Sequence, residues 1–293
     1  PQDRYEIASE FRNPDAILVR SHVLFSDDIG PSVKAIARAG AGVNNIPVDR
    51  MTTAGIPVFN APGANANAVK ELVIAGMLLA SRNICQAWDF ARSLQGDDAA
   101  IQKAVESGKK QFVGFELPGK TLGVIGLGAI GVEVANAALD LGMKVVGFDP
   151  AMTVRNAWQL SPGVEQEDTL DELFQHADFV TCHVPLIDAT RQMVNADRIA
   201  LMNDGAVLIN FARGGVVDDA AALAALDSGK LHAYVTDFPT PELIAHPKVI
   251  ALPHLGASTG EAEANCAIMV AENVKDYLEN GNIRFSVNFP EAR

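Results

Sequence analysis

Short apolar runs alternate with amphipathic segments along most of this chain. The runs of strand length cover residues 15–19, 56–59, 121–125, 144–148, 179–184, 206–211, 233–236 and 249–252. Segments with apolar residues at helical spacing cover residues 31–39, 68–82, 170–176, 196–202 and 218–227. Strands that alternate with helices predict an α/β protein with parallel, doubly wound sheets.

The alternation is less regular in residues 94–120, which are polar and contain four glycines. We predict a short helix near residues 99–106 and interpret the stretch as a linker or arm between domains, with a subunit contact as a further role. A solvated loop is an equal alternative. Near the end, Ser258 and Glu261 have the spacing of a capping box, which predicts a helix to Leu278. Residues 286–289 are predicted to form a last strand.

Two polar loops, residues 38–45 and 60–67, follow predicted elements where α/β sheets bind ligands. Asn65 or Asn67 is predicted to cap the helix that comes next.

Residues 121–149 contain the most informative motif. Gly126, Gly128 and Gly131 follow a predicted strand in the spacing G-x-G-x-x-G, and a predicted helix comes next. In a dinucleotide site the first glycine makes the tight turn and the second lets the backbone approach the pyrophosphate. The third lets helix and strand pack closely, and the helix N-terminus offers N–H groups to the phosphates.

Asp149 ends the second strand of this unit. An acid at that place accepts hydrogen bonds from ribose hydroxyls and repels a 2′-phosphate, which favours NAD over NADP. The alternative is a Rossmann-like unit without a ligand, in which the glycines serve only packing.

Three further polar residues come where predicted strands end: Arg213, Glu242 and His254. Oxidation of a 2-hydroxy acid needs a base for the hydroxyl proton, and a histidine suits that task. A carboxylate on the other ring nitrogen would fix its tautomer, and an arginine would hold the substrate carboxylate. Each residue also has a plain interpretation, as a strand-end arginine, a surface acid and a histidine satisfied in the core.

The motifs together resemble the D-isomer-specific 2-hydroxyacid dehydrogenase family over almost the whole chain. The matching stretches are RAGAGVNNIPVD, GKTLGVIGLGAIG, CHVPL, NFARGGVVDD and ALPHLGAST. The resemblance implies catalytic roles for Arg213, His254 and Glu242. The family often reads D-V-F-x-x-E, whereas here Asp237 directly precedes Phe238. The Asp-to-Glu spacing of five is kept, but the frame is shifted by one residue.

The resemblance also implies two α/β domains with the active site in the cleft between them. Residues 1–84 and 263–293 would bind substrate, and residues 85–262 would bind NAD. The implied cofactor contacts are Gly126, Leu127, Gly128, Ala129, Ile130, Gly131, Asp149, His183, Val184, Pro185, Thr190, Phe211, Ala212, Asp237 and Gly256, with His254 beside them. For His183 the alternative is that it only lines the adenosine side.

Within the family the resemblance is to the D-3-phosphoglycerate dehydrogenase branch, whose reaction begins serine biosynthesis and yields 3-phosphohydroxypyruvate. Arg20, Ser21 and Arg38 would bind the phosphate, and Gly42, Val43 and Asn65 the carboxylate end. Alternatively, Arg20 and Arg38 pair with local acids, and the substrate is glycerate, glyoxylate or lactate. A non-enzymatic NADH-sensing corepressor is a further alternative.

Composition limits the partners. The net charge of −13 argues against nucleic acid, and the longest apolar stretch, residues 72–80, is too short to span a bilayer. Cys85, Cys182 and Cys266 have no metal or redox spacing, and we expect no metal site and buried thiols in a cytoplasmic protein. A homodimer is expected by resemblance.

The chain starts at Pro1 without a methionine and stops at Arg293, where related enzymes often continue into a regulatory domain. We therefore expect it to be a piece of a longer protein.

Overall fold

The computed structural model describes residues 4–10 and 12–289, so the two chain ends, Pro1 and Arg293, lie outside the described residues. The chain divides into two compact units. The small unit consists of two segments, one that ends at Asn65 and one that begins at Thr259. The large unit is Ala66–Ser258. No helix in the described part of the chain is long and apolar enough to cross a membrane.

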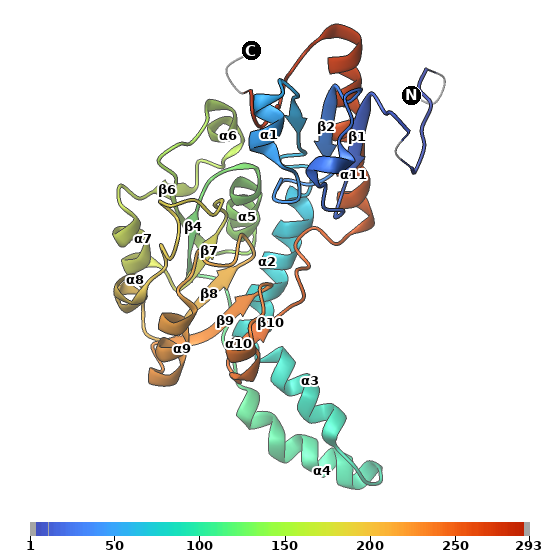
Figure 1. Ribbon diagram of the computed structural model, residues 1–293. Helices are drawn as coiled ribbons and strands as arrows, with labels where there is room; N and C mark the ends of the chain where they lie inside the picture. Colours follow the sequence, from blue (N-terminus) through green and yellow to red (C-terminus); the bar gives the residue numbers. More distant parts are fainter. Residues whose placement is uncertain (1–3, 11, 290–293) are drawn as a thin grey trace. The chain divides into compact units, whose positions relative to one another are not determined.

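The large unit is built on a seven-stranded parallel sheet (Figure 1). Its order is β10 (Val249–Ala251), β9 (Leu231–Thr236), β8 (Ala206–Asn210), β7 (Phe179–Cys182), β4 (Thr121–Ile125), β5 (Lys144–Phe148), β6 (Val164–Gln166). The expected parallel sheet is confirmed. Of the seven strands in this sheet, the sequence pattern did not predict β6, because this edge strand is short and two of its three residues are exposed.

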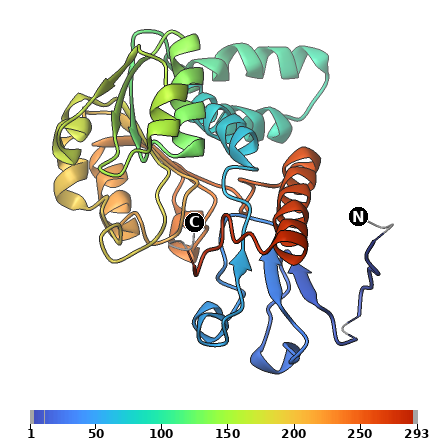
Figure 2. The same ribbon diagram turned by 90° about the horizontal axis from the view of Figure 1, so that it is seen from above.

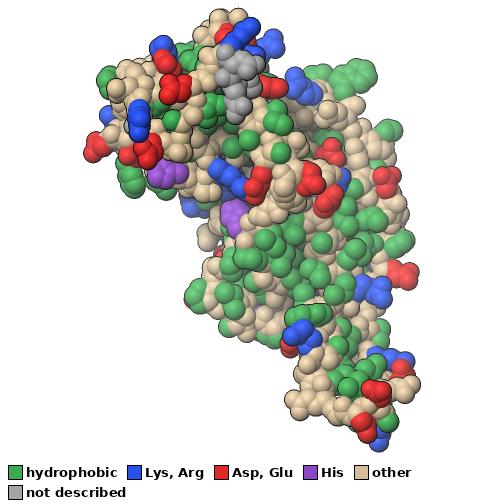
Figure 3. Space-filling view, turned by 90° about the vertical axis from the view of Figure 1, so that its right-hand side faces the viewer, with side chains coloured by type: hydrophobic (Ala, Val, Ile, Leu, Met, Phe, Trp, Pro, Cys, Tyr) green, Lys and Arg blue, Asp and Glu red, His purple; other side chains and the backbone are tan. Residues whose placement is uncertain are grey.

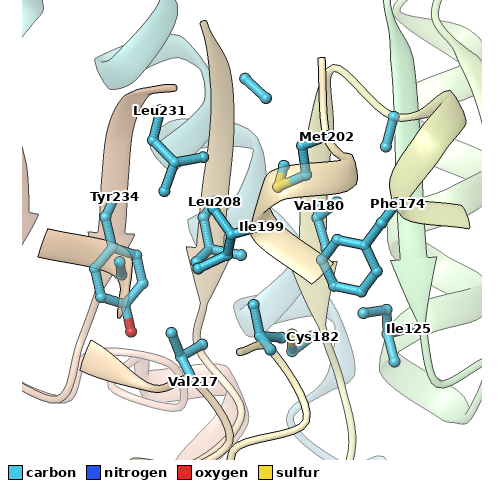
Figure 4. Close-up of a cluster of buried hydrophobic side chains, with 14 of the residues drawn as sticks. Ile125, Phe174, Val180, Cys182, Ile199, Met202, Leu208, Val217, Leu231 and Tyr234 are labelled. Atoms are coloured by element: carbon cyan, nitrogen blue, oxygen red, sulfur yellow. The ribbon is translucent and has the colours of Figure 1, made fainter. Parts of the chain in front are cut away.

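Helices cover both faces of this sheet. They are α2 (Ala66–Ser81), α5 (Ala129–Asp140), α7 (Leu170–His176), α8 (Ala196–Leu201), α9 (Asp219–Ser228) and α10 (Pro241–Ala245). The short helix α6 (Val154–Gln159) has no buried residue and contacts α5. In β8, Leu208 packs with Phe174 and Tyr234 on one face (Figure 4), whereas Val207 packs with Met77 on the other. Because both faces of the central strands are buried, these strands are continuously apolar in sequence.

The helix α2 belongs to the large unit, although the sequence placed residues up to 84 in the substrate domain. Val73 and Met77 of α2 are completely buried in the cluster that includes Leu122. A Cβ at Gly76 would lie 3.3 Å from side-chain atoms of Phe211, so α2 approaches the sheet closely. The large unit ends at Ser258, whereas the sequence predicted that the NAD-binding domain ends at residue 262.

Residues 84–112 form a helical arm of the large unit. It comprises α3 (Ile84–Ser93), α4 (Asp98–Gly108) and the 3-10 helix η2 (Lys109–Phe112), and α3 and α4 run side by side in Figures 1 and 2. The Phe90 and Phe112 rings pack with centroids 5.3 Å apart. Figure 3 shows hydrophobic side chains on the arm and on the surface next to it. The predicted helix near residues 99–106 is present, and the predicted subunit contact stays a prediction.

The small unit contains a three-stranded parallel sheet in the order β1 (Ala16–Val19), β2 (Ala35–Arg38), β3 (Val58–Phe59). Side chains of α1 (Val48–Thr53) belong to the buried cluster on one face of the sheet. The long helix α11 (Gly260–Asn280) contributes to the cluster on the other face. The remaining element is the 3-10 helix η1 (Ser26–Asp28).

The predicted helix over residues 31–39 is wrong, because β2 occupies its second half. Ala35, Ile36 and Ala37 are completely buried in the central strand, between β1 and β3. Alanine is a good helix former, but pairing on both edges and burial on both faces override that local preference.

Two expectations near the C-terminus also differ from the structure. The N-cap of α11 is Thr259, whose hydroxyl accepts the Ala262 N–H, rather than Ser258. The predicted strand over 286–289 is only an isolated bridge between Ser286 and Phe59. The Asn288 side chain takes over the pairing there, accepting the Val58 N–H at 2.9 Å.

Candidate active site

The glycine loop joins β4 to α5 in the predicted geometry. Gly126 has φ +89°, and a Cβ there would lie 2.7 Å from the His183 carbonyl oxygen. A Cβ at Gly131 would lie 1.9 Å from the Gly126 carbonyl oxygen, so only glycine fits. A Cβ at Gly128 would meet nothing within 4 Å. The first and third glycines therefore allow close packing, and the second leaves open space beside the loop.

The N-terminus of α5 opens onto this space. Gly128 is the N-cap residue, and the first helical bond runs from the Val132 N–H to the Gly128 carbonyl at 3.0 Å. The N–H groups of Ala129, Ile130 and Gly131 precede that bond, which makes this helix end a site for phosphate. Leu127 is buried, so its contribution to a ligand would be backbone.

Asp149 stands beside the loop, at the end of β5. Its Oδ2 accepts the Leu127 N–H at 2.8 Å, and its Oδ1 accepts the Ala151 N–H at 2.8 Å. These two bonds hold the carboxylate at the neighbouring strand end, where the ribose of a dinucleotide is expected. The cradle of glycines, helix end and acid therefore fits NAD.

The segment after β7 lies against the same loop. The Thr190 hydroxyl donates to the Pro185 carbonyl at 2.5 Å and orders the turn that follows Val184. Burial lowers the pKa of His183 to about 3, so its ring is neutral near pH 7 and has too little affinity for a proton to be a good general base. Its Nδ1 is buried and has no hydrogen-bond partner among the described residues.

Arg213 follows β8, and buried Asn210 shapes the turn that presents it. Asn210 accepts the Ala212 N–H at 3.1 Å and donates to the Arg213 carbonyl at 3.0 Å. The side chains of Phe211 and Ala212 are buried, whereas that of Arg213 is exposed. Sequence reasoning missed Asn210, although a lone amide ending an apolar strand was the available signal.

His254 follows β10, and its backbone is fastened to the end of β9. The His254 N–H donates to the Asp237 carbonyl at 3.1 Å, and the Gly256 N–H donates to Asp237 Oδ2 at 3.1 Å. The ring of His254 is exposed and meets the Phe238 ring edge-on, with centroids 5.0 Å apart. Since β8, β9 and β10 are neighbours in a parallel sheet, Arg213, Asp237 and His254 lie at one edge.

Glu242 is placed differently from the other two expected catalytic residues. It is exposed in the first turn of the short helix α10. Burial raises the pKa of Asp219, and the neighbouring charges of Asp218 and Glu242 raise it further. Neither ring nitrogen of His254 has a hydrogen bond within the described residues, to Glu242 or to any other group.

The residues expected to bind substrate lie on loops of the small unit. Arg20 forms an ion pair with Glu263 at 2.7 Å, with both side chains about half exposed. Arg38 donates to the carbonyls of Arg20 and Gly42 at 3.0 and 2.7 Å, so it braces the loop that also carries Val43. A hollow of about 440 Å³ between β1 and α11 is lined by Leu18, Val19, Arg20, Ala39, Glu263, Ala264, Ala267 and Val270.

Two asparagines complete the loops of the small unit. Buried Asn45, which sequence reasoning did not single out, donates to the His22 carbonyl at 2.6 Å and fixes the loop after Ser21. Asn65 immediately precedes α2, and its Oδ1 is buried with no hydrogen-bond partner among the described residues. The predicted cap hydrogen bond from Asn65 is therefore not formed.

The family model for the NAD-binding domain of D-isomer specific 2-hydroxyacid dehydrogenases matches residues 74–256. The chain belongs to this dehydrogenase family. That match covers the glycine loop, Asp149, Arg213 and His254, and it begins inside α2, which the structure also assigns to the large unit. NAD is the cofactor of the matched domain.

Relatives agree on the family. D-3-phosphoglycerate dehydrogenase of Methanocaldococcus jannaschii is 40% identical over 294 residues, which are 97% of this chain and 54% of that protein. Hydroxypyruvate reductase of Thermotoga maritima is 40% identical over 272 residues, covering 89% and 83%. The structure of NAD⁺-bound 3-phosphoglycerate dehydrogenase of Entamoeba histolytica matches with TM-score 0.73 and 28% identity, covering 93% and 82%. This chain spans about half of the first of these relatives.

Proposed function

We propose that this protein oxidises D-3-phosphoglycerate to 3-phosphohydroxypyruvate with NAD, the step that feeds serine synthesis. The observation that carries the proposal is one edge of the seven-stranded sheet, where a dinucleotide cradle, Arg213 and His254 come together. Bound NAD supplies the hydride acceptor. His254 takes the hydroxyl proton as the C2 hydride leaves, and Arg213 holds the carboxylate with its planar fork.

The choice of a phosphorylated substrate rests on the small unit and on the relatives. Arg20 and Arg38, with Ser21, would face the phosphate, and the Arg20–Glu263 pair is exposed enough for an anion to displace the carboxylate. The backbone N–H groups of Gly42 and Val43 and the side-chain NH₂ of Asn65 would donate to the carboxylate end. Several relatives at 35–40% identity are D-3-phosphoglycerate dehydrogenases.

A second candidate is an unphosphorylated hydroxy acid, favoured by the 40% identity to a hydroxypyruvate reductase. Formation of NADH at 340 nm with D-3-phosphoglycerate, D-glycerate and D-lactate in parallel separates the two. Preference for phosphoglycerate supports the proposal, and preference for another acid keeps the mechanism but rejects the substrate. No turnover, with NADH still bound, would reject the enzyme function and favour an NADH-sensing corepressor.

A further inference from the structure

Asp237 is a buried carboxylate with an oxygen that nothing in the described structure uses. Its residue is 1% exposed, its Oδ2 accepts the Gly256 N–H, and its Oδ1 is buried without a hydrogen-bond partner among the described residues. A buried carboxylate oxygen left unpaired costs free energy. The position therefore points to a donor that reaches Oδ1 in the working protein.

The backbone around Asp237 brings the loop of His254 onto it. Beyond the last pair of β9 and β10, the Leu252 N–H donates to the Thr236 carbonyl at 2.8 Å. The His254 N–H then donates to the Asp237 carbonyl. His254 itself has φ +49°, a conformation that a non-glycine residue holds only where its surroundings impose it.

Electrostatics links the same two side chains. Burial raises the pKa of Asp237, and the Gly256 N–H and the charge of His254 oppose that rise. The backbone N–H groups of Asp237 and Leu255 also oppose it. The Phe238 ring, packed edge-on against the imidazole, limits where that ring can turn.

Glu242, the acid that the family resemblance implies for this task, is held elsewhere. Thr240 caps α10 by accepting the Leu243 N–H at 3.3 Å, and Pro241 begins the helix. Since Leu243 is fully buried, the helix fixes Glu242 in its exposed first turn. Hydrogen bonds join the His254 loop to Asp237, whereas none joins it to Glu242 among the described residues.

We propose that Asp237, rather than Glu242, is the carboxylate that positions His254 for proton transfer, an inference that rests on the proposed dehydrogenase function. Oδ1 of Asp237 accepts the Nδ1–H of the imidazole, which leaves Nε2 free to take the substrate's hydroxyl proton. The carboxylate then stabilises the imidazolium formed as the hydride leaves C2.

The variant Asp237→Asn tests this assignment because an amide has one oxygen and cannot accept from both the Gly256 N–H and the His254 Nδ1–H. Its oxygen would accept the Gly256 N–H, and its NH₂ group would then face His254 and favour the wrong ring tautomer. We expect kcat to fall on the order of 10²-fold or more, with the KM and the Kd for NADH changed less than about threefold. Glu242→Gln should keep kcat within about threefold. Asp204→Asn, on an exposed turn, is the matched control.

A second measurement determines the tautomer of the His254 imidazole and does not depend on turnover. Long-range ¹H–¹⁵N correlation spectra of the unliganded protein report the His254 tautomer, with His254→Gln used to assign its signals. We expect the Nδ1–H form in the wild type and in Glu242→Gln, and the Nε2–H form in Asp237→Asn. If the wild-type protein were inactive on every hydroxy acid tested, the proposed function would be rejected. The His254 tautomer would still test whether Asp237 positions the imidazole.

Two results would overturn the assignment. One is loss of turnover in Glu242→Gln while Asp237→Asn stays active. The other is an Asp237→Asn protein whose Kd for NADH rises more than tenfold with an unchanged His254 tautomer, since Oδ1 would then serve the cofactor as the family resemblance implies.

Discussion

The large and small units hold their candidate site residues in different ways. In the large unit the residues follow parallel strands, and backbone hydrogen bonds fix them, as between His254 and Asp237. In the small unit charged side chains make the contacts, as in the Arg20–Glu263 ion pair and the hydrogen bond from Arg38 to the Gly42 carbonyl. The first arrangement suits chemistry that needs fixed geometry. The second suits recognition of an anion, because an anion can replace the present partners of these arginines.

The largest expected effect tests the chemistry of the large unit. His254→Ala should lower kcat by roughly 10³-fold, because general-base catalysis is worth about 10²–10⁴-fold. The Kd for NADH, measured by fluorescence, should change less than about threefold. His176→Ala is the matched control, since His176 is exposed and pairs only with Glu167 on the surface. Full activity of the His254 variant would remove the proton-transfer assignment.

The next effect tests the cofactor cradle. Gly131→Ala should weaken NADH binding by about 10²-fold or more, because its Cβ would overlap the Gly126 carbonyl and force the loop away from α5. Titration of NADH fluorescence measures the change. Gly30→Ala is the control, since a Cβ there meets nothing within 4 Å. Unchanged binding in Gly131→Ala would show that the loop does not hold the dinucleotide.

A smaller effect tests the small unit. Arg20→Gln should raise the KM for D-3-phosphoglycerate by about tenfold, since a charge-assisted contact is worth roughly 1.4 kcal/mol or more. The KM for D-glycerate should stay the same, because that substrate has no phosphate. Steady-state kinetics with both acids makes the comparison. Arg12→Gln, a surface pair with Glu10, is the control. Equal changes for both acids would mean that Arg20 only supports the fold.

The smallest effect concerns stability. Because burial raises the pKa of Asp237, the folded state binds its proton more tightly than the unfolded state. Stability from this group is therefore present at low pH and is lost as pH rises through the folded pKa. Asp237→Asn should melt about 2 °C above the wild type at pH 8, with a gap that narrows as the pH falls. Calorimetry of the unliganded protein checks this, and a gap that widens toward low pH would contradict the sign.

Sequence patterns predicted most of the large unit, because its central strands are buried on both faces and are therefore continuously apolar in sequence. The glycine spacing also located a loop whose first and third glycines allow no side chain. The pattern failed at β2, where buried alanines mimic a helix, and at the end of the chain, where Asn288 replaces a strand with side-chain hydrogen bonds.

The sequence by itself determined the α/β class, the glycine loop with Asp149, and Arg213 and His254 as candidates, because these depend on local spacing. Tertiary structure decided which groups lie next to one another. It placed Glu242 on the exposed first turn of α10, buried Asp237 beneath the His254 loop and paired Arg20 with Glu263. A shift of one residue changes which side chain follows a strand, and only the packed sheet shows that Asp237 then lies under the His254 loop.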